Sequence, residues 1–531
     1  MLQPKHPARA KSRPAGTSPL ADLFAPLDLL LAGGGDTRLA VDRADGLNGY
    51  GCRPTPRPEA FTFASSTATS ISDRAYRHAG VARETLLAAA RDGDAIDSAI
   101  ETARARLLAC LGLSGAGIAV VFSPSGTDSQ LHALFCTQTL FAGAPLTSIV
   151  VASDETGSGT RFAVTGRHFS TVTALGTDVS KGEMLAGLDD AGRIDIAVCD
   201  ESGRRRTQDA VDRDVIAAVA RETRNGRKVF LQTMDRSKLW RRAPSRACLD
   251  EIAARWPDDV QIAADVCQLR ASPARIAASL GRGEMVLVTG SKFFTGPPFS
   301  GALLVPPDLA KRLCGTSAVP AGLRDYSHAS DWPREWDGVR AQLPDGFNAG
   351  QWLRWEAALA EMEAYFAVPL GFRTSALRHF SQAAARLIDA GGFELSGDEP
   401  RDRTAKGDDQ EFTPRTILPF ILRRNGTTLT GEDAAAIYRA LNRDVSADLP
   451  VNASAEEKRI AAQLCHIGQP VPVRARDGSQ TAVLRISAGA RIVSDSWCAD
   501  ESAARGALEY ECDQVRRIVA KINLLLRHRI A

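Results

Sequence analysis

Long hydrophobic runs are absent from the sequence, which argues against a membrane-spanning segment. The most apolar early stretch, residues 29–32, is far too short to cross a bilayer and is followed by three glycines. No secretory leader is visible at the start of the chain. We therefore expect a cytoplasmic protein with no membrane partner.

Cysteine pairs with metal-ligand spacing are absent as well. The ten cysteines include no CxxC pair, and most of them lie in apolar stretches such as residues 109–111. Such cysteines are typical of reduced, buried thiols in a cytoplasmic protein. The sequence therefore predicts no metal site.

A strong charge of one sign is also missing. The chain has 65 basic and 63 acidic residues, so its net charge is only +2, which favours neither nucleic acid nor an anionic membrane as a partner. The start of the chain is an exception, because basic side chains lie there among prolines. We expect a disordered tail, with a specific binding arm as the alternative. The basic residues concerned are Lys5, His6, Arg9, Lys11 and Arg13.

The rest of the sequence alternates short apolar runs with helical patterns. Its 531 residues, 44% of them hydrophobic, can form a large core and two or three structural units. Helical patterns such as residues 130–140 and 211–224 lie between several of the apolar runs. This alternation predicts an α/β fold with a mostly parallel, seven-stranded sheet wrapped by helices. The predicted strands are residues 118–122, 148–152, 194–199, 229–232, 260–264, 285–288 and 302–305.

Composition and periodicity divide the chain into four parts. We expect a disordered tail and N-terminal arm over residues 1–72, in which the Ser-, Thr- and Ala-rich stretch 61–72 could cross into a site or an interface. A large domain then covers residues 73–345. A helical segment over residues 346–390 connects it to a smaller C-terminal α+β domain over residues 391–531. The elements predicted in this last domain are strands at 416–422 and 482–487 and helices at 431–441 and 503–527.

A lysine in a glycine-rich turn is the most informative residue of the chain. Lys292 follows the apolar run 285–288 within the stretch Thr-Gly-Ser-Lys-Phe-Phe-Thr-Gly-Pro-Pro. Burial at the end of a strand can lower the pKa of an amine, and such an amine can form a Schiff base with a carbonyl. The alternative is an ordinary solvated lysine. A nucleotide-binding P-loop is excluded, because its spacing is absent and Phe293 stands where Ser or Thr should bind magnesium.

A carboxylate follows another predicted strand. Asp265 comes directly after the apolar run 260–264, where an unpaired charge would be costly. A protonated pyridine nitrogen would be a suitable partner, and the alternative is an aspartate that caps the next turn. Gln268 lies three residues further on and could contact a cofactor's phenolic oxygen or face water.

A turn of small residues precedes both of these motifs. Ser125, Gly126 and Thr127 lie between the strand predicted at 118–122 and a predicted helix. Backbone N–H groups at a helix start attract a phosphate, although the same residues also serve as ordinary helix caps. An anion site, a carboxylate and a lysine are together what pyridoxal phosphate requires from a protein. All three follow strands, whose carboxyl ends carry the functional loops of a parallel sheet.

At these motifs the sequence resembles the fold-type I pyridoxal-phosphate enzymes, specifically the aminotransferase class V group that includes the cysteine desulfurases. The similarity covers most of residues 60–500. The stretches 289–292, 296–298 and 301–303 are similar to the group's Ser-Gly-His-Lys, Gly-Pro-Lys-Gly and Gly-Ala-Leu pattern. Asp-Val-Cys-Gln at 265–268 resembles the group's Asp-x-x-Gln/His, and Ser-Gly-Thr at 125–127 resembles its phosphate turn.

The resemblance implies roles for the residues of these motifs. Lys292 would be the Schiff-base lysine and Asp265 the partner of the cofactor's ring nitrogen. Thr289 and Ser291 would lie near the phosphate. Cys-Asp-Glu-Ser-Gly at 199–203 is similar to the group's Asn-Asn-Glu-Thr-Gly, which would place Asp200 beside the cofactor.

Two further positions follow from the same resemblance. Val-Leu-Arg-Ile-Ser at 483–487 is similar to the C-terminal strand whose arginine binds the substrate's α-carboxylate, a task that suits the guanidinium group of Arg485. Phe-Asn-Ala-Gly at 347–350 resembles the Gly-Thr-x-Asn segment that reaches a partner subunit's phosphate. Asn348 would then be a cofactor contact, and the protein would be a homodimer with shared active sites.

The sequence also departs from the group's pattern. The ring-stacking position is usually a histidine, whereas residues 153–157 contain neither histidine nor an aromatic, and Thr156 takes the corresponding place. Ser291 stands before the lysine in place of histidine, and Asp200 stands where asparagine is common. These differences leave the reaction type open.

The favoured function is a pyridoxal-phosphate-dependent enzyme that acts on an amino acid or amine, most simply an aminotransferase. The first alternative is a cysteine desulfurase or C–S lyase, because Cys465 lies 20 residues before Arg485 in a stretch predicted as a turn-bounded segment. A buried, structural thiol is the competing interpretation of Cys465. The second alternative is a protein that keeps the fold but only binds or regulates.

Overall fold

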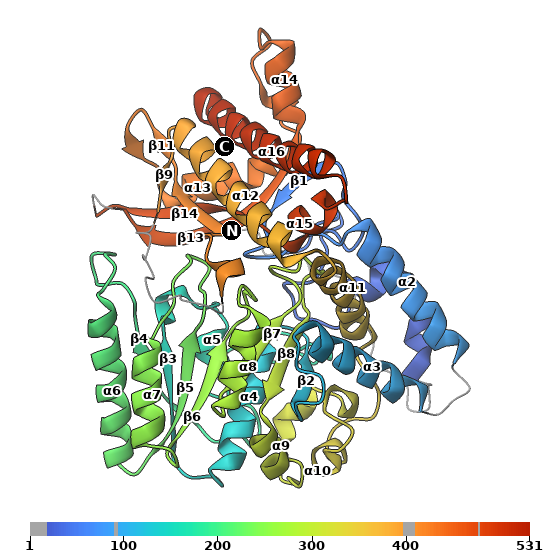
Figure 1. Ribbon diagram of the computed structural model, residues 1–531, viewed down its shortest axis with the longest axis vertical. Coiled ribbons are helices and arrows are strands. Elements are labelled where there is room, and N and C mark those ends of the chain that lie inside the picture. The colour runs from blue at the N-terminus through green and yellow to red at the C-terminus, as the bar shows by residue number, and fades with distance from the viewer. Residues whose placement is uncertain (1–18, 90–93, 397–408, 476–477, 531) are drawn as a thin grey trace.

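The computed structural model describes residues 19–89, 94–396, 409–475 and 478–530, so the predicted basic tail lies outside the described residues. Two sheets organise this part of the chain (Figure 1). The larger sheet and its helices fill the lower half of the view, and the smaller sheet lies above it beneath the C-terminal helices.

The larger sheet has seven strands in the order β2-β8-β7-β6-β5-β3-β4. β8 is antiparallel to β2 and β7, and the remaining neighbours are parallel. The prediction of a mostly parallel, seven-stranded α/β sheet is therefore confirmed. The strands are β2 (Ala119–Ser123), β3 (Leu146–Val151), β4 (Gly192–Ile196), β5 (Lys228–Met234), β6 (Val260–Asp265), β7 (Met285–Thr289) and β8 (Gly301–Val305).

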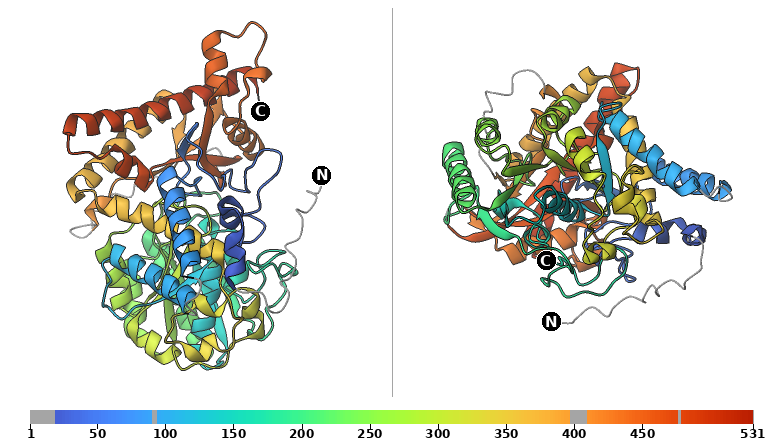
Figure 2. Two further views of the ribbon diagram at one scale, coloured as in Figure 1. Left: turned by 90° about the vertical axis from the view of Figure 1, so that its right-hand side faces the viewer. Right: turned by 90° about the horizontal axis from the view of Figure 1, so that it is seen from below.

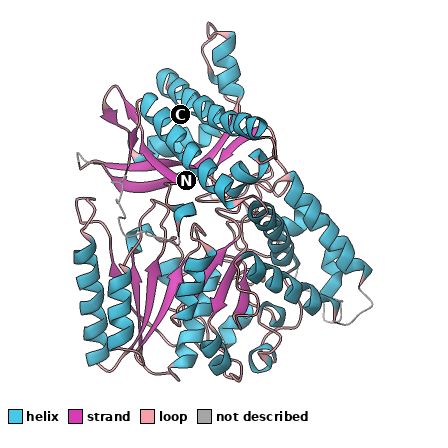
Figure 3. Ribbon diagram, in the orientation of Figure 1, coloured by secondary structure: helices cyan, strands magenta, loops and turns pink. Residues whose placement is uncertain are grey.

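Both faces of this sheet are covered by helices, which is why its strands are continuous apolar runs (Figure 3). In β7, Met285 and Leu287 belong to one apolar cluster and Val286 and Val288 to another, as the alternation of side chains along a strand requires. Helix α4 packs against β2, β7 and β8, and α6 packs against β3, β4 and β5. The helices of this half are α3 (Ala95–Cys110), α4 (Gly126–Leu140), α5 (Thr160–Ala163), α6 (Gln208–Arg224), α7 (Arg246–Arg255), α8 (Pro273–Gly281), α9 (Pro307–Leu313) and α10 (Asp337–Arg340).

The smaller sheet takes its edge strand from the N-terminal arm. Its order is β1-β13-β14-β10-β9, and β1 pairs in parallel with β13 through partners such as Phe61 and Cys465. The sequence did not predict this strand. A separate two-stranded hairpin joins β11 and β12. The strands are β1 (Ala60–Phe63), β9 (Glu394–Leu395), β10 (Ile417–Ile421), β11 (Arg423–Arg424), β12 (Thr427–Thr428), β13 (Leu464–Arg474) and β14 (Gln480–Ser487).

Long helices connect the two halves and cover the smaller sheet. Helix α11 packs against α2, α3 and α15, and α16 runs across the upper part of the molecule, with α14 projecting above it (Figure 2). None of the described helices is long and apolar enough to span a membrane. The helices are α1 (Leu27–Ala32), α2 (Asp73–Ala88), α11 (Ala349–Phe366), α12 (Leu370–Ala390), α13 (Gly431–Leu441), α14 (Ala455–Ala462), α15 (Ala490–Ser496) and α16 (Glu501–His528).

Candidate active site

The three predicted site motifs are the points at which long buried stretches reach solvent. From Glu284 to Pro306 every residue is buried except Lys292, which is half-buried. From residue 261 to residue 272, every residue is buried except Asp265, which is half-buried. From residue 119 to residue 137, every residue is buried except Gly126 and Thr127, which are half-buried. Each exception lies at the end of a strand or a few residues after it. All of them are at the carboxyl ends of strands of the larger sheet, where sheets of this kind carry functional loops.

Contacts between the strand ends bring these motifs together. The Thr289 hydroxyl donates to the Cys267 carbonyl at 2.7 Å, which joins the end of β7 to the turn after β6. A side chain at Gly126 would meet the Cys267 sulfur at 2.8 Å, so the turn after β2 also closes against Cys267. Burial and the charge of Asp265 raise the pKa of the Cys267 thiol, whereas the charge of Lys292 lowers it, so both charged groups lie near Cys267. The structure therefore places the predicted lysine, carboxylate and small-residue turn around one residue.

Lys292 and Asp265 have polar atoms available for a ligand. Within the described chain, the Lys292 amine makes no hydrogen bond and no ion pair. One oxygen of Asp265 accepts from the Cys267 backbone N–H at 3.0 Å, which orients the carboxylate. Ser291, beside the lysine, is buried.

The turn at Ser125 begins helix α4 with a capping box. The Ser125 hydroxyl accepts from the backbone N–H groups of Thr127 and Asp128, at 3.2 and 3.4 Å, and donates to the Asp128 carboxylate at 2.5 Å. The alternative interpretation of these residues, as an ordinary helix cap, is therefore correct. It does not exclude a phosphate, because Gly126 and Thr127 remain half-buried at the positive end of the helix dipole.

An arginine from the N-terminal arm lies beside this turn, and the sequence reasoning missed it. Arg38 donates to Ser125 Oγ at 3.4 Å and forms a bidentate ion pair with Asp36. Burial and the nearby charge of Asp36 raise the pKa of Asp128 to about 7, although the hydrogen bonds from Ser125 oppose this shift. Arg38 thus adds a positive charge to the predicted phosphate turn.

Arg485 lies in β14 and is almost fully buried, at 2% exposure. Its guanidinium donates to the Gln469 carbonyl at 2.7 Å and to the Thr67 hydroxyl at 2.8 Å. Nη1 has no hydrogen-bond partner although it is buried, and burial lowers the pKa of the group to about 10. A buried donor without a partner can serve a ligand that offers an acceptor oxygen.

The Ser- and Thr-rich stretch of the arm passes between the two halves, as the sequence suggested. The Ser65 hydroxyl donates to the Ala488 carbonyl at 2.6 Å, and the Thr69 hydroxyl donates to the Thr295 carbonyl at 3.3 Å. Thr67 is the one half-buried residue from 63 to 71. The segment therefore lies between the Lys292 turn and the strand that carries Arg485.

The side chain of Gln268 is hydrogen-bonded to this segment of the arm. Its amide nitrogen donates to the Ser66 carbonyl at 3.0 Å, and its oxygen accepts from Arg270 at 2.8 Å. Arg270 is itself fully buried and was missed by the sequence reasoning. Gln268 was predicted to contact a cofactor's phenolic oxygen. To do so, it would have to replace one of these two hydrogen bonds by a bond to the cofactor.

The stretch predicted to hold the ring-stacking residue has a buried glutamate at its centre. Glu155 pairs with Arg241 at 2.5 Å and accepts from Ser237. Next to it, the Thr156 hydroxyl donates to the Ser153 carbonyl at 3.0 Å and faces a hollow of about 280 Å³. That hollow is lined by Val150, Ser153, Asp154, Thr156, Arg161, Arg193 and Asp195.

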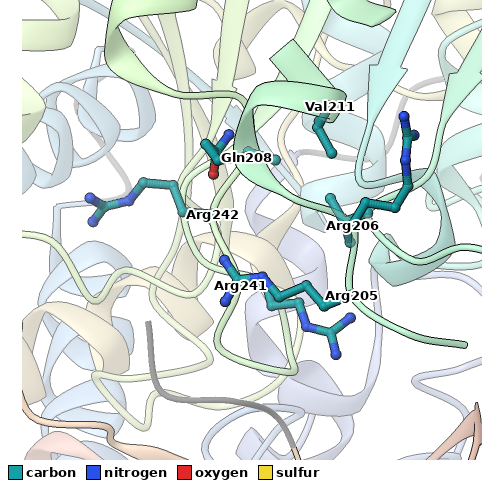
Figure 4. A pocket seen from close by; sticks show the side chains of 8 residues that line it. Arg205, Arg206, Gln208, Val211, Arg241 and Arg242 are labelled. Atoms are coloured by element: carbon teal, nitrogen blue, oxygen red, sulfur yellow. The ribbon is translucent and has the colours of Figure 1, made fainter. Parts of the chain in front are cut away.

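A second hollow adjoins Arg241 and has room for about one water, at about 10 Å³ (Figure 4). Arg205, Arg206 and Arg242 also contribute to its walls. Neither hollow is lined by Lys292.

Asp200 does not join the residues around Lys292. It is fully exposed, and its carboxylate accepts from the backbone N–H groups of Ser202 and Arg204, each at 2.9 Å. The hydrogen bond from the Ser202 hydroxyl, together with these backbone bonds, lowers its pKa. The edge strand β4 ends at Ile196, four residues earlier, so the chain has left the sheet before Asp200 and closes an exposed turn there.

Asn348 caps helix α11 within its own chain. Its side-chain oxygen accepts from the Gln351 N–H at 2.9 Å, and its nitrogen donates to the Gly34 carbonyl at 2.9 Å. Both polar atoms are therefore engaged inside the protomer. The contact with a partner's phosphate stays a prediction.

The prediction of a turn-bounded segment around Cys465 is wrong. Cys465 lies in β13, where it pairs with Phe61 of β1 and is 1% exposed. Burial raises the pKa of its thiol to about 12. A nucleophilic thiol needs an accessible, electropositive position, so the structural interpretation of Cys465 holds and the desulfurase alternative loses its residue.

No protein-family model matches the chain, and no curated protein sequence matches it. The structure of Oryza sativa TDC with PLP and tryptamine is 15% identical, covers 95% of this chain and 90% of that chain, and has a TM-score of 0.50. The structure of the same protein with PLP alone is 14% identical, covers 96% of this chain and 90% of that chain, and has a TM-score of 0.50. Ureidoglycine-glyoxylate aminotransferase from Bacillus subtilis gives 11% identity, 90% and 94% coverage and a TM-score of 0.47.

At these identities the likeness concerns the fold. It extends over nearly the whole chain and includes the mostly parallel seven-stranded sheet on which the candidate site is built. The chain therefore shares its fold with the two Oryza sativa TDC structures, both of which contain PLP.

Proposed function

We propose that the protein is a pyridoxal-phosphate-dependent enzyme that acts on an amino acid or amine, and most simply an aminotransferase. The observation that carries the proposal is the burial pattern around the strand ends. Three separate buried stretches reach solvent only at Lys292, at Asp265 and at the Gly126–Thr127 turn. The cofactor needs an amine, a carboxylate and an anion site, and these half-buried positions supply one of each. The fold alone does not require this coincidence.

The residues present fit the cofactor. The Lys292 amine would attach to its aldehyde carbon, Asp265 would hold the proton of its ring nitrogen, and the N–H groups at the start of α4 would bind its phosphate. When bound, pyridoxal phosphate supplies an electron sink for negative charge at the substrate's α-carbon. Lys292, once exchanged for a substrate amine, can move the α-proton.

Arg485 completes the proposed site from the other half of the molecule. Its unpartnered Nη1 suits a substrate carboxylate, because a hydrogen bond between a charged guanidinium and a charged carboxylate is stronger than one between neutral groups. A substrate held between Arg485 and Lys292 would have its amino group directed towards the cofactor. The homodimer with shared active sites is part of this proposal, with Asn348 as the predicted contact across the interface.

Absorption spectroscopy with and without added pyridoxal phosphate tests the cofactor. We expect a visible band that borohydride abolishes, a pyridoxyl group fixed on the peptide of Lys292, and loss of both in Lys292→Ala. Lys311→Ala is the matched control, because Lys311 is 80% exposed on α9. If the protein stays colourless with excess cofactor, the enzyme proposal is withdrawn.

A second measurement tests the reaction. A nitrogen-labelled amino acid should pass its label to a 2-oxo acid, as detected by mass spectrometry of the new amino acid. Release of carbon dioxide or sulfide without transfer of the label would replace the aminotransferase with another reaction on the same cofactor. No turnover of any amine by a protein that carries the cofactor would favour the binding alternative.

A further inference from the structure

A second lysine reaches solvent from a buried stretch at the same edge of the sheet. From Val229 to Trp240 every residue is buried except Lys238, which lies in the loop after β5. This is the signature that marks Lys292 and Asp265. In the described part of the chain, the Lys238 amine makes no hydrogen bond and no ion pair.

The loop that carries Lys238 is held from both halves of the molecule. On one side of Lys238, the Ser237 hydroxyl donates to Glu155, and the Ser237 oxygen accepts from the Leu239 and Arg241 N–H groups, each at 3.1 Å. On the other side, Leu239 is buried in an apolar cluster with Val483 of β14. Lys238 therefore sits on a fixed loop between the two sheets.

This packing brings Lys238 towards Arg485. Val483 and Arg485 are two residues apart on one strand, so they share a face of β14. The positive charges of Arg485 and Lys292 both act on Lys238 and, after burial, are the main causes that lower its pKa, to about 8. Arg485 and Lys292 therefore lie close enough for their charges to act on Lys238.

In the described part of the chain, little negative charge acts on Lys238 and Arg485. Glu155 acts on Lys238 but is already paired with Arg241. Arg485 donates only to neutral oxygens of Gln469 and Thr67, and its buried Nη1 has no partner. Buried positive charges without counterions are costly, and an acidic ligand would remove this cost.

We propose that Lys238 and Arg485 form a two-cation site that binds two carboxylates of the substrate, so the substrate is an amino acid with a second carboxylate on its side chain. Arg485 would hold one carboxylate and Lys238 the other. The inference rests on the proposed function for the amino group at Lys292, and it adds Lys238 as the residue that determines specificity.

Calorimetric titration with two unreactive acids of equal length tests this site. Glutarate has two carboxylates and no amino group, and pentanoate has one carboxylate. The holoenzyme should bind glutarate about 10- to 100-fold more tightly than pentanoate, as expected for one additional hydrogen-bonded charge pair. Lys238→Gln should remove this preference, and Lys238→Arg should retain most of it. Lys311→Gln, which removes the same charge from an exposed position, should leave it unchanged.

Several outcomes overturn the proposal. They are equal affinity for the two acids in the unchanged protein, a preference that survives in Lys238→Gln, and a preference that Lys311→Gln also removes. Thermal unfolding of each variant must match that of the unchanged protein, and Lys238→Met, which also removes the charge, supplies the test if Lys238→Gln unfolds. Cofactor absorption is recorded on the same samples. A coloured protein without the preference refutes only the two-cation site, whereas a colourless protein with the preference refutes only the cofactor.

Discussion

The hydroxyl of Thr289 donates to the backbone carbonyl of Cys267 at 2.7 Å, and both groups are buried. This bond connects the strand that leads to Lys292 with the turn that follows Asp265. The two residues that the proposed chemistry needs are therefore held at a fixed separation by a contact that involves neither of them.

Replacing Thr289 by valine should test this connection. The hydroxyl is lost and the buried Cys267 carbonyl is left without its donor, so Thr289→Val should lower the free energy of unfolding by about 1–3 kcal/mol. Urea unfolding followed by circular dichroism measures the change. Thr289→Ser keeps the hydroxyl and should lose less. A valine variant as stable as the serine variant would show that the bond contributes nothing.

Removing the partner of Glu155 should be more harmful. Arg241→Met leaves a buried carboxylate unpaired, and we expect a loss of about 3–5 kcal/mol in the free energy of unfolding at neutral pH. Adding Glu155→Gln should restore most of the loss, because no buried charge remains. Chemical denaturation of the two variants decides the point, and a double variant no more stable than Arg241→Met would contradict this account.

The Cys465 thiol should be unreactive in the folded protein. Its pKa of about 12 leaves almost no thiolate at neutral pH, and the strand around it excludes reagents. Iodoacetamide followed by peptide mass spectrometry should label the half-buried Cys498 before Cys465. Cys465→Ala should leave cofactor absorption unchanged and cost about 1 kcal/mol of stability. Rapid labelling of Cys465 would revive the desulfurase alternative.

Asp128 should make stability depend on pH. Its pKa rises from 3.8 to about 7 on folding, so the folded state binds its proton more tightly than the unfolded state does. The resulting stabilisation is complete below the unfolded value and is lost as pH rises through about 7, by at most about 4 kcal/mol.

Asp128→Asn cannot titrate and supplies the comparison. The free energy of unfolding of the unchanged protein should fall, relative to that of Asp128→Asn, as pH rises from about 4 to about 7. Urea unfolding at a series of pH values measures both curves. Parallel curves over that range would mean that Asp128 stays ionised in the folded protein.

Much of the larger sheet could be predicted because its signals are local. A run such as residues 285–288 is apolar throughout since both faces of the strand are covered, and the glycine-rich turn after it marks the strand end. The same rule would have found Lys238, which follows β5 as Lys292 follows β7. It went unnoticed because no family motif surrounds it.

The errors concern contacts between distant parts of the chain. The strand β1 exists because residues around Phe61 pair with residues around Cys465, some 400 positions later. Without that partner, the Cys465 stretch looks like a turn and residues 60–63 look irregular. Gln268 was left open for a cofactor because its bonds to Ser66 and Arg270 depend on the arm crossing the site.

The amino-acid sequence by itself determined the seven-strand alternation and the positions of Lys292, Asp265 and the Ser125 turn, since strand periodicity and turn chemistry act over a few neighbouring residues. Only the tertiary structure decided which side chains remain available. Packing of Leu239 on Val483 places Lys238 towards Arg485. Helix capping occupies the side chain of Asn348, and the pairing of β1 with β13 buries Cys465. Desolvation and the loss of hydrogen-bond partners are properties of the assembled chain, and they separate a candidate active-site group from an inert one.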